Sequence, residues 1–93
     1  MLFRSQQIKK LYRMADNQVE VLELSADEFS RFGVTLKDMA RDLQPNVLVA
    51  AIIRKGVVQI PDGDSTIEKG DKVIIISASD VRIQNLDDIL QGQ

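Results

Sequence analysis

Carboxylate side chains are concentrated in one short stretch of this 93-residue sequence, residues 62–71. Asp62, Asp64, Glu68 and Asp71 supply the oxygen ligands that a hard divalent cation such as Ca²⁺ prefers. Their spacing does not match the EF-hand calcium loop, and aspartates beside glycine are also typical of turns. Two interpretations therefore stay open here, a cation-sensing site and a series of turns.

Two polar residues flank the most apolar segment of the chain, residues 47–53. Arg54 follows this segment beside Lys55, so its guanidinium could clamp a phosphate or a carboxylate, or could carry its charge from a strand end to solvent. Asn46 precedes the segment and could read an adenine edge, or could satisfy a helix end across Pro45. Both residues are candidates for ligand binding.

The composition excludes most catalytic machinery. The chain has no Cys and no His, so it lacks a thiol nucleophile, a zinc–thiolate site and the commonest general base. The serines have no visible base to activate them. A net charge of −2 and 4% aromatic residues do not favour nucleic-acid binding, and no apolar run approaches the roughly 18 residues of a membrane span. We expect an intracellular, non-catalytic binding or regulatory domain.

A β-hairpin is predicted near the start of the chain. Residues 8–14 fit a helix or a strand, but the turn residues Asp16 and Asn17 and the alternating segment 18–24 favour two paired strands. The sequence Ser25-Ala-Asp-Glu28 matches a capping box and predicts at most a short helical turn that ends before Gly33.

The rest of the chain predicts one main helix and three further strands. Thr35 caps a segment whose apolar residues recur at helical spacing, and Pro45 stops it, which predicts a helix over 35–43. Strands are expected at 47–53, 57–60 and 72–77, with a tight turn at Lys55-Gly56 and further turns at 61–64 and 68–71. Residues 86–90 suggest one or two helical turns near the end.

These elements predict an α+β fold: a small mixed or antiparallel β-sheet built from β-hairpins, with one main helix at 35–43. The strands 47–53 and 72–77 are apolar on both faces, which is typical of strands buried on both sides of a sheet. One short helix covers only one side. The other side must be covered by a second copy of the chain or by the hairpin 8–24 folding over it, and we favour a homodimer.

The order of several motifs resembles that of one family. Residues 51–56 read Ala-Ile-Ile-Arg-Lys-Gly, residues 60–64 read Ile-Pro-Asp-Gly-Asp, and residues 67–74 read Ile-Glu-Lys-Gly-Asp-Lys-Val-Ile. With the segments 19–23, 35–38 and 85–90, they resemble the C-terminal domain of RCK regulators of potassium transport, the TrkA-C domain. The resemblance covers most of residues 8–90, with 1–7 as a linker outside the domain and 91–93 as a tail.

This resemblance implies a regulatory role. Members of the family pair this domain with a Rossmann domain that binds NAD or ATP, and form cytoplasmic rings on a membrane potassium transporter, at the inner face of the cell membrane. No strand, Gly-rich loop and helix precede Ile8, so NAD or ATP is not expected to bind this chain.

Some relatives dimerise through this domain and bind cyclic di-AMP between protomers. The positions expected to face such a cleft are Arg41, Asn46, Val47 and Pro61, with Arg54 as a further candidate. Three functions remain open: a ligand-sensing dimer, a ligand-free assembly module, and a divalent-cation sensor.

Overall fold

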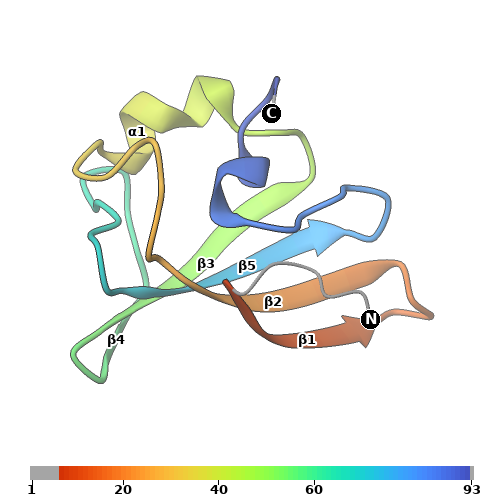
Figure 1. Ribbon diagram of the computed structural model, residues 1–93. Helices are drawn as coiled ribbons and strands as arrows, with labels where there is room; N and C mark the ends of the chain where they lie inside the picture. The colour runs from red at the N-terminus through yellow and green to blue at the C-terminus, as the bar shows by residue number, and fades with distance from the viewer. Residues whose placement is uncertain (1–6, 93) are drawn as a thin grey trace.

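The computed structural model describes residues 7–92, in which five antiparallel strands form one sheet (Figure 1). The strands lie in the order β1-β2-β5-β3-β4. Their bounds are β1 (Ile8–Met14), β2 (Val19–Ser25), β3 (Val47–Arg54), β4 (Val57–Gln59) and β5 (Lys72–Ala78). One α-helix, α1 (Leu36–Met39), and two 3₁₀ helices, η1 (Ala40–Asp42) and η2 (Leu86–Ile89), complete the fold. The predicted α+β class is confirmed, and all strand pairs are antiparallel.

The predicted hairpins are confirmed. β1 pairs with β2, and β3 pairs with β4 across a tight turn at Lys55-Gly56. Both turn residues have positive φ, 52° and 78°, which matches the right-handed twist of the flanking strands. The hairpin β1–β2 extends the sheet at its edge instead of folding over it, so the idea that residues 8–24 cover the second side of the sheet is wrong.

The predicted helix 35–43 is in the right place but shorter. Thr35 caps it, since its Oγ1 accepts a hydrogen bond from the Asp38 N–H at 3.3 Å. After one α-helical turn the chain continues as 3₁₀ helix and becomes extended at Leu43, which bridges to Leu90. The C-terminal segment causes this early end, because its backbone groups pair with residues 42–44 in place of further helical bonds.

No helical turn follows Ser25, contrary to the capping-box prediction. Ser25 ends β2, and its backbone N–H donates to the Gln7 carbonyl. The next residue, Ala26, donates to the Asp71 carbonyl and accepts from the Gly70 N–H. Pairing with backbone distant in the sequence therefore holds Ser25 and Ala26 and prevents a helix from starting there, and the chain bends at residues 27–28 instead.

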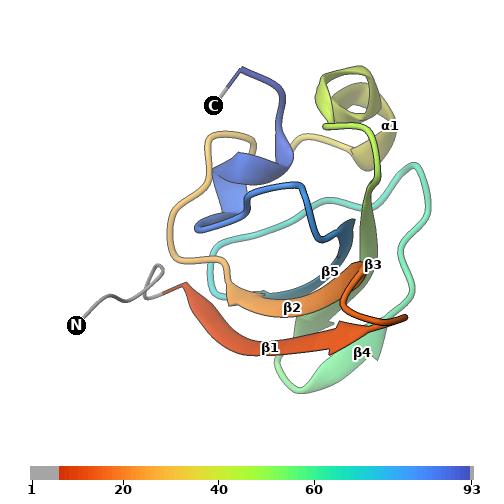
Figure 2. The same ribbon diagram turned by 90° about the vertical axis from the view of Figure 1, so that its right-hand side faces the viewer.

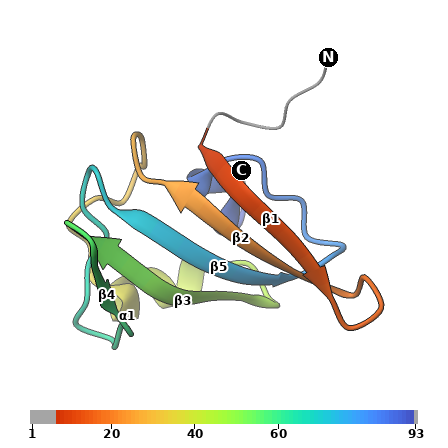
Figure 3. The same ribbon diagram turned by 90° about the horizontal axis from the view of Figure 1, so that it is seen from below.

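The hydrophobic core lies on one side of the sheet only. In Figure 2 the sheet is seen nearly edge-on, with α1, η2 and the long loops gathered above it. Core side chains come from alternate positions of β2, β3 and β5 and from these covering segments: Leu22, Leu24, Val49, Ile52, Val73, Ile75, Met39, Ile67, Ile83, Leu86 and Ile89. The other side of the sheet has no covering layer among residues 7–92 (Figure 3).

The turn between β1 and β2 offers a test of backbone strain. Ala15, Asp16 and Asn17 all have positive φ, and Ala15 (φ 52°) is the one of the three whose side chain tolerates this region poorly. Ala15→Gly is expected to raise the free energy of unfolding by about 0.5 kcal/mol, because relief of the strain exceeds the extra entropy of glycine in the unfolded chain. Urea denaturation measures the change, and a loss of stability would contradict the reading.

Candidate functional site

The side of the sheet that faces away from α1 and η2, here called the open face, carries an apolar row across four strands. Strand register aligns Tyr12 with Val21, Val21 with Ile76, and Ile76 with Leu48. Tyr12 and Leu48, at the two ends of this row, are 59% and 57% exposed. Such a continuous apolar row, left in solvent, marks an interaction surface.

The open face extends on both sides of this row. Toward the β1–β2 turn it remains apolar, with Met14 aligned to Val19 and Val19 to Ala78. Toward the other end it gains charge: Lys10 aligns with Glu23, which lies beside Ile74. The surface is thus apolar at its centre and at one end, and partly charged at the other.

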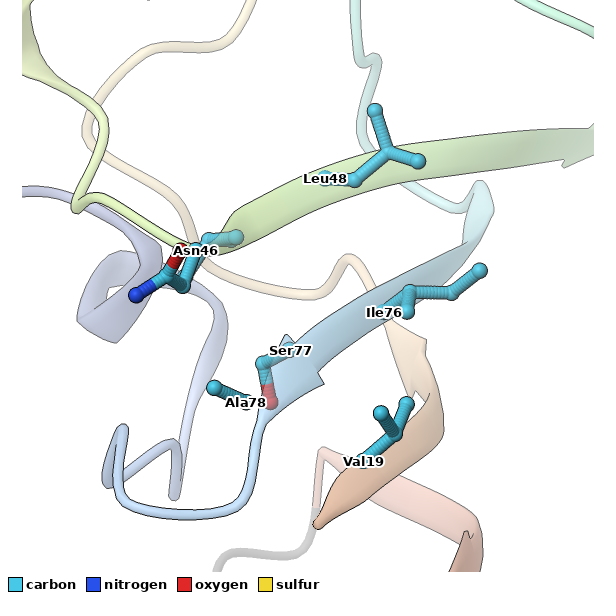
Figure 4. A pocket seen from close by; sticks show the side chains of 7 residues that line it. Val19, Asn46, Leu48, Ile76, Ser77 and Ala78 are labelled. Atoms are coloured by element: carbon cyan, nitrogen blue, oxygen red, sulfur yellow. The ribbon is translucent and has the colours of Figure 1, made fainter. Parts of the chain in front are cut away.

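A shallow hollow interrupts the open face beside Leu48. Its volume is about 320 Å³, and β2, β3 and β5 line it with Val19, Asn46, Val47, Leu48, Ile76, Ser77 and Ala78. Figure 4 shows the side chains of Leu48, Ile76 and Val19 around it, with Asn46 at its rim and the Asn46 carboxamide directed away from these three side chains. The hollow has the shape and polarity to receive an apolar or aromatic side chain.

A second cavity, here called the groove, lies where α1 meets the loop after β4. It has a volume of about 300 Å³ and mainly apolar walls: Leu36, Lys37, Ala40, Leu43, Val47, Leu48, Val49, Pro61, Asp62 and Gly63. The loop is held to α1 because the N–H groups of Leu36 and Lys37 donate to the carbonyls of Ser65 and Gly63, each at 2.9 Å. Val47 and Leu48 line both the groove and the hollow, so β3 is the wall between them.

The structure brings together three of the five candidate ligand residues. Val47 and Pro61 line the groove, and Asn46 lies at the rim of the hollow behind the shared wall. Arg41 is exposed on η1, between the groove residues Ala40 and Leu43. Its guanidinium makes no ion pair within residues 7–92 and is free to meet an anion.

Arg54 lies at the opposite end of β3 and is engaged in a buried ion pair. Its Nε and Nη2 donate to the two carboxylate oxygens of Asp71 at 2.9 and 2.8 Å, and Nη2 also donates to the Thr66 carbonyl. Asp71 is 2% exposed and accepts a further hydrogen bond from the Glu68 N–H at 2.8 Å. These bonds hold the turn 68–71 against β3. Arg54 therefore has a structural role, at a place far from the other four candidate ligand residues.

Burial alone would raise the pKa of the Asp71 carboxyl. The hydrogen bonds from Arg54 and from the Glu68 N–H, together with the positive charge of Arg54, outweigh burial and hold the pKa below its ordinary value. Asp71 therefore remains ionised at neutral pH.

The acidic stretch does not assemble as a cation site. Asp64 pairs with Lys37 at 2.9 Å, Glu68 accepts from the Thr66 hydroxyl, and Asp62 accepts from the Asp64 N–H within its own turn. Within the described part of the chain, no three His, Cys, Asp or Glu side chains lie where they could hold a metal ion together. Turn formation accounts for these carboxylates, and the cation-sensing interpretation has no geometric support.

The backbone conformation at Asn46 favours asparagine or glycine at this position. The contribution of the backbone to stability can therefore be measured separately from that of the side chain. Its φ of 64° lies in the left-handed region, which asparagine and glycine accept and alanine does not. We expect Asn46→Ala to lower the free energy of unfolding by about 1 kcal/mol and Asn46→Gly to change it by less than about 0.5 kcal/mol. Thermal denaturation followed by circular dichroism measures both, and equal losses would contradict the backbone reading.

The sequence reasoning missed several surface residues that the structure makes prominent. Leu48, Tyr12 and Met14 were grouped with strands but not recognised as one exposed surface. Their strand parity was the available signal. A bulge between Ile8 and Lys10 obscured it, because Ile8 shares the parity of Tyr12 in sequence yet faces the core.

The comparisons with known proteins identify one domain family. The family model for the TrkA-C domain matches residues 30–91. The Trk system potassium uptake protein TrkA homolog of Archaeoglobus fulgidus is 38% identical over 64 residues, which cover 68% of this chain and 14% of that protein. The Trk system potassium uptake protein TrkA of Azorhizobium caulinodans is 31% identical over 78 residues, 83% of this chain and 17% of that protein.

The aligned region is thus less than a fifth of the length of either relative. No helix among residues 7–92 is long and apolar enough to cross a membrane. The family model covers well over half of the chain, and the motifs at 51–56, 60–64 and 67–74 that carried the resemblance lie on β3, β5 and the segment between them. This chain belongs to the TrkA-C domain family.

Proposed function

We propose that this domain is the dimerising, ligand-sensing part of a regulatory protein for potassium uptake. The regulator acts in the cytoplasm, at the inner face of the membrane that holds the potassium transporter. Two copies of the domain associate through the open face, and a ligand in the groove favours one arrangement of the two copies. The open face is the observation that carries the proposal, because a stable soluble sheet rarely leaves a central row such as Tyr12–Val21–Ile76–Leu48 in water.

The groove suits a nucleotide that combines bases with phosphates. Leu36, Val47 and Pro61 give it flat apolar walls against which a base can lie. Lys37 lines the groove, and Arg41 is exposed on η1 between the groove residues Ala40 and Leu43, so both are candidate phosphate partners; the exposed ion pair of Lys37 with Asp64 is weak enough to exchange. The carboxamide of Asn46, which lies behind the shared wall at the rim of the hollow, has the donor and acceptor that match an adenine edge. Cyclic di-AMP presents both chemical groups and is the first ligand to test.

Ligand sensing follows from the shared wall between the two cavities. A ligand that touches Val47 and Leu48 in the groove also touches residues of the hollow on the open face. It therefore binds one dimer arrangement better than another, and this difference in affinity is what shifts the population. In the parent regulator, the shift is passed to the Rossmann domains and from them to the transporter.

Calorimetric titration of the chain with cyclic di-AMP tests this proposal. We expect saturable binding that weakens at least about tenfold in Arg41→Ala and in Asn46→Gly, a loss of about 1.4 kcal/mol each. Arg82→Ala is the matched control, because Arg82 is exposed and lies outside the groove. Equal weakening by the control, or a dimer that shows no binding heat, would overturn ligand sensing. The second result would leave a ligand-free assembly module.

A further inference from the structure

We propose a specific arrangement of the two copies, in which Tyr12 of each copy fills the hollow of the other. The two open faces pack together about a two-fold axis that runs parallel to the strands, midway between β2 and β5. This inference rests on the proposed dimer and adds how its halves meet. It makes the hollow a site that a single chain leaves incomplete.

The area of the open face is sufficient for such a contact. Four strands overlap in this arrangement; at about 4.8 Å apart, with up to seven or eight residues at about 3.3 Å each, they give a contact of about 500 Å² per copy. Two copies then bury about 1,000 Å², the lower limit for a specific interface. An interface of this size predicts a dimer that dissociates on dilution in the micromolar range.

The position of the axis follows from the strand order. With the axis between the neighbours β2 and β5, β1 of one copy lies over β3 of the other, because each is the next strand outward. Tyr12 and Leu48 belong to the same row of the open face, so Tyr12 comes to lie directly over Leu48 and the hollow beside it. Met14, one row further along β1, meets the Asn46 rim.

Side-chain sizes agree with this fit. Tyr12 is 59% exposed in the single chain and is the largest side chain on the open face. The hollow it would enter has apolar walls of Val19, Leu48 and Ile76. A tyrosine buried in such a pocket is the usual form of an interface hot spot.

Charge complementarity selects this axis over the alternative. The same rotation lays β2 over β5 of the partner, which sets Glu23 of one copy over Ile74 of the other, with Lys72 of that copy one residue pair further along the strand. An axis perpendicular to the strands and centred on the Tyr12 row would instead set Glu23 against Val19. There the carboxylate would be buried among apolar side chains with no lysine of the partner beside it, which is less favourable.

Crosslinking between two single-cysteine variants tests the arrangement. The chain has no Cys, so Tyr12→Cys and Leu48→Cys each introduce one thiol. Facing sheets lie about 10 Å apart, a distance that a short bismaleimide spans. We expect several-fold more covalent dimer from a mixture of the two variants than from either alone, since like positions lie three strands apart, about 14 Å, in addition to the gap between sheets.

Sedimentation of the same samples separates the two proposals. A covalent dimer from one variant alone, with none from the mixture, would overturn the arrangement while the dimer stands. A monomer in the unsubstituted chain would overturn the dimer itself.

Charge reversal gives a second, independent measurement in case either cysteine weakens association. Glu23→Lys and Lys72→Glu each place like charges together in their own dimer, but a mixture of the two restores both opposite-charge contacts. We expect the mixture to associate more tightly than either variant. No gain on mixing would contradict the arrangement.

Discussion

Ile76→Lys is expected to convert the proposed dimer into a monomer. Ile76 is at the centre of the open face, between Val21 and Leu48, so its replacement puts an ammonium group into the middle of the contact. Because the dimer is two-fold symmetric, two ammonium groups are buried, one from each copy. We therefore expect the dissociation constant of the dimer to rise by about 100-fold or more. Sedimentation equilibrium over a range of concentrations measures it.

Val57→Lys is the matched control for this experiment. Val57 is 61% exposed on β4, but it pairs with Arg54 and so lies on the other side of the sheet from Ile76. It should leave association unchanged, and both variants should keep the circular dichroism of the folded chain. Equal dissociation of both variants would show that a general change in charge, not the open face, governs assembly.

Asp71→Asn is expected to be among the most destabilising conservative substitutions in the chain. Asp71 is almost fully buried, and its two oxygens accept three hydrogen bonds, two from Arg54 and one from the Glu68 N–H. The neutral amide cannot satisfy all three donors and removes the charge that compensates Arg54. We expect a loss of about 3 kcal/mol in the free energy of unfolding at pH 7, measured by urea denaturation.

This loss should depend on pH in a defined direction. The pKa of Asp71 is lower in the folded chain than in the unfolded chain, so its stabilising contribution is complete above the unfolded value of about 4. The contribution disappears as the pH falls from there through the lowered folded-state pKa. The difference between the parent chain and Asp71→Asn should therefore shrink in strong acid.

Asp64→Asn serves as the control for both effects. The Asp64 side chain is 81% exposed, and its pair with Lys37 lies in solvent. Its replacement should cost well under about 1 kcal/mol. A similar cost at the two positions would contradict the importance of burial at Asp71.

Local sequence patterns were sufficient to predict most of the strands. The run 47–53 is apolar without interruption, as are residues 73–76 inside the segment 72–77, and the turns between them carry glycine where a positive φ is needed. The same patterns predicted an apolar surface in need of a partner. That reasoning was correct about the missing layer, since the described chain covers only one side of its sheet.

The errors arose where distant backbone decides local structure. The helix at 35–43 is cut short by pairing with residues 89–91, and the capping box at Ser25 is overruled by bonds to Gln7 and Asp71. Neither partner is visible in a local window. Arg54 shows the same limit, because only the fold reveals that Asp71, seventeen positions further on, occupies its guanidinium.

Sedimentation equilibrium of the unsubstituted chain, from below one micromolar to above one hundred, tests the central claim most directly. The account predicts a reversible monomer–dimer equilibrium whose midpoint lies in the micromolar range, as an interface of about 1,000 Å² suggests. A monomer at every concentration would contradict it. The open face would then belong to another partner, and the arrangement of Tyr12 in the hollow would fall with the dimer.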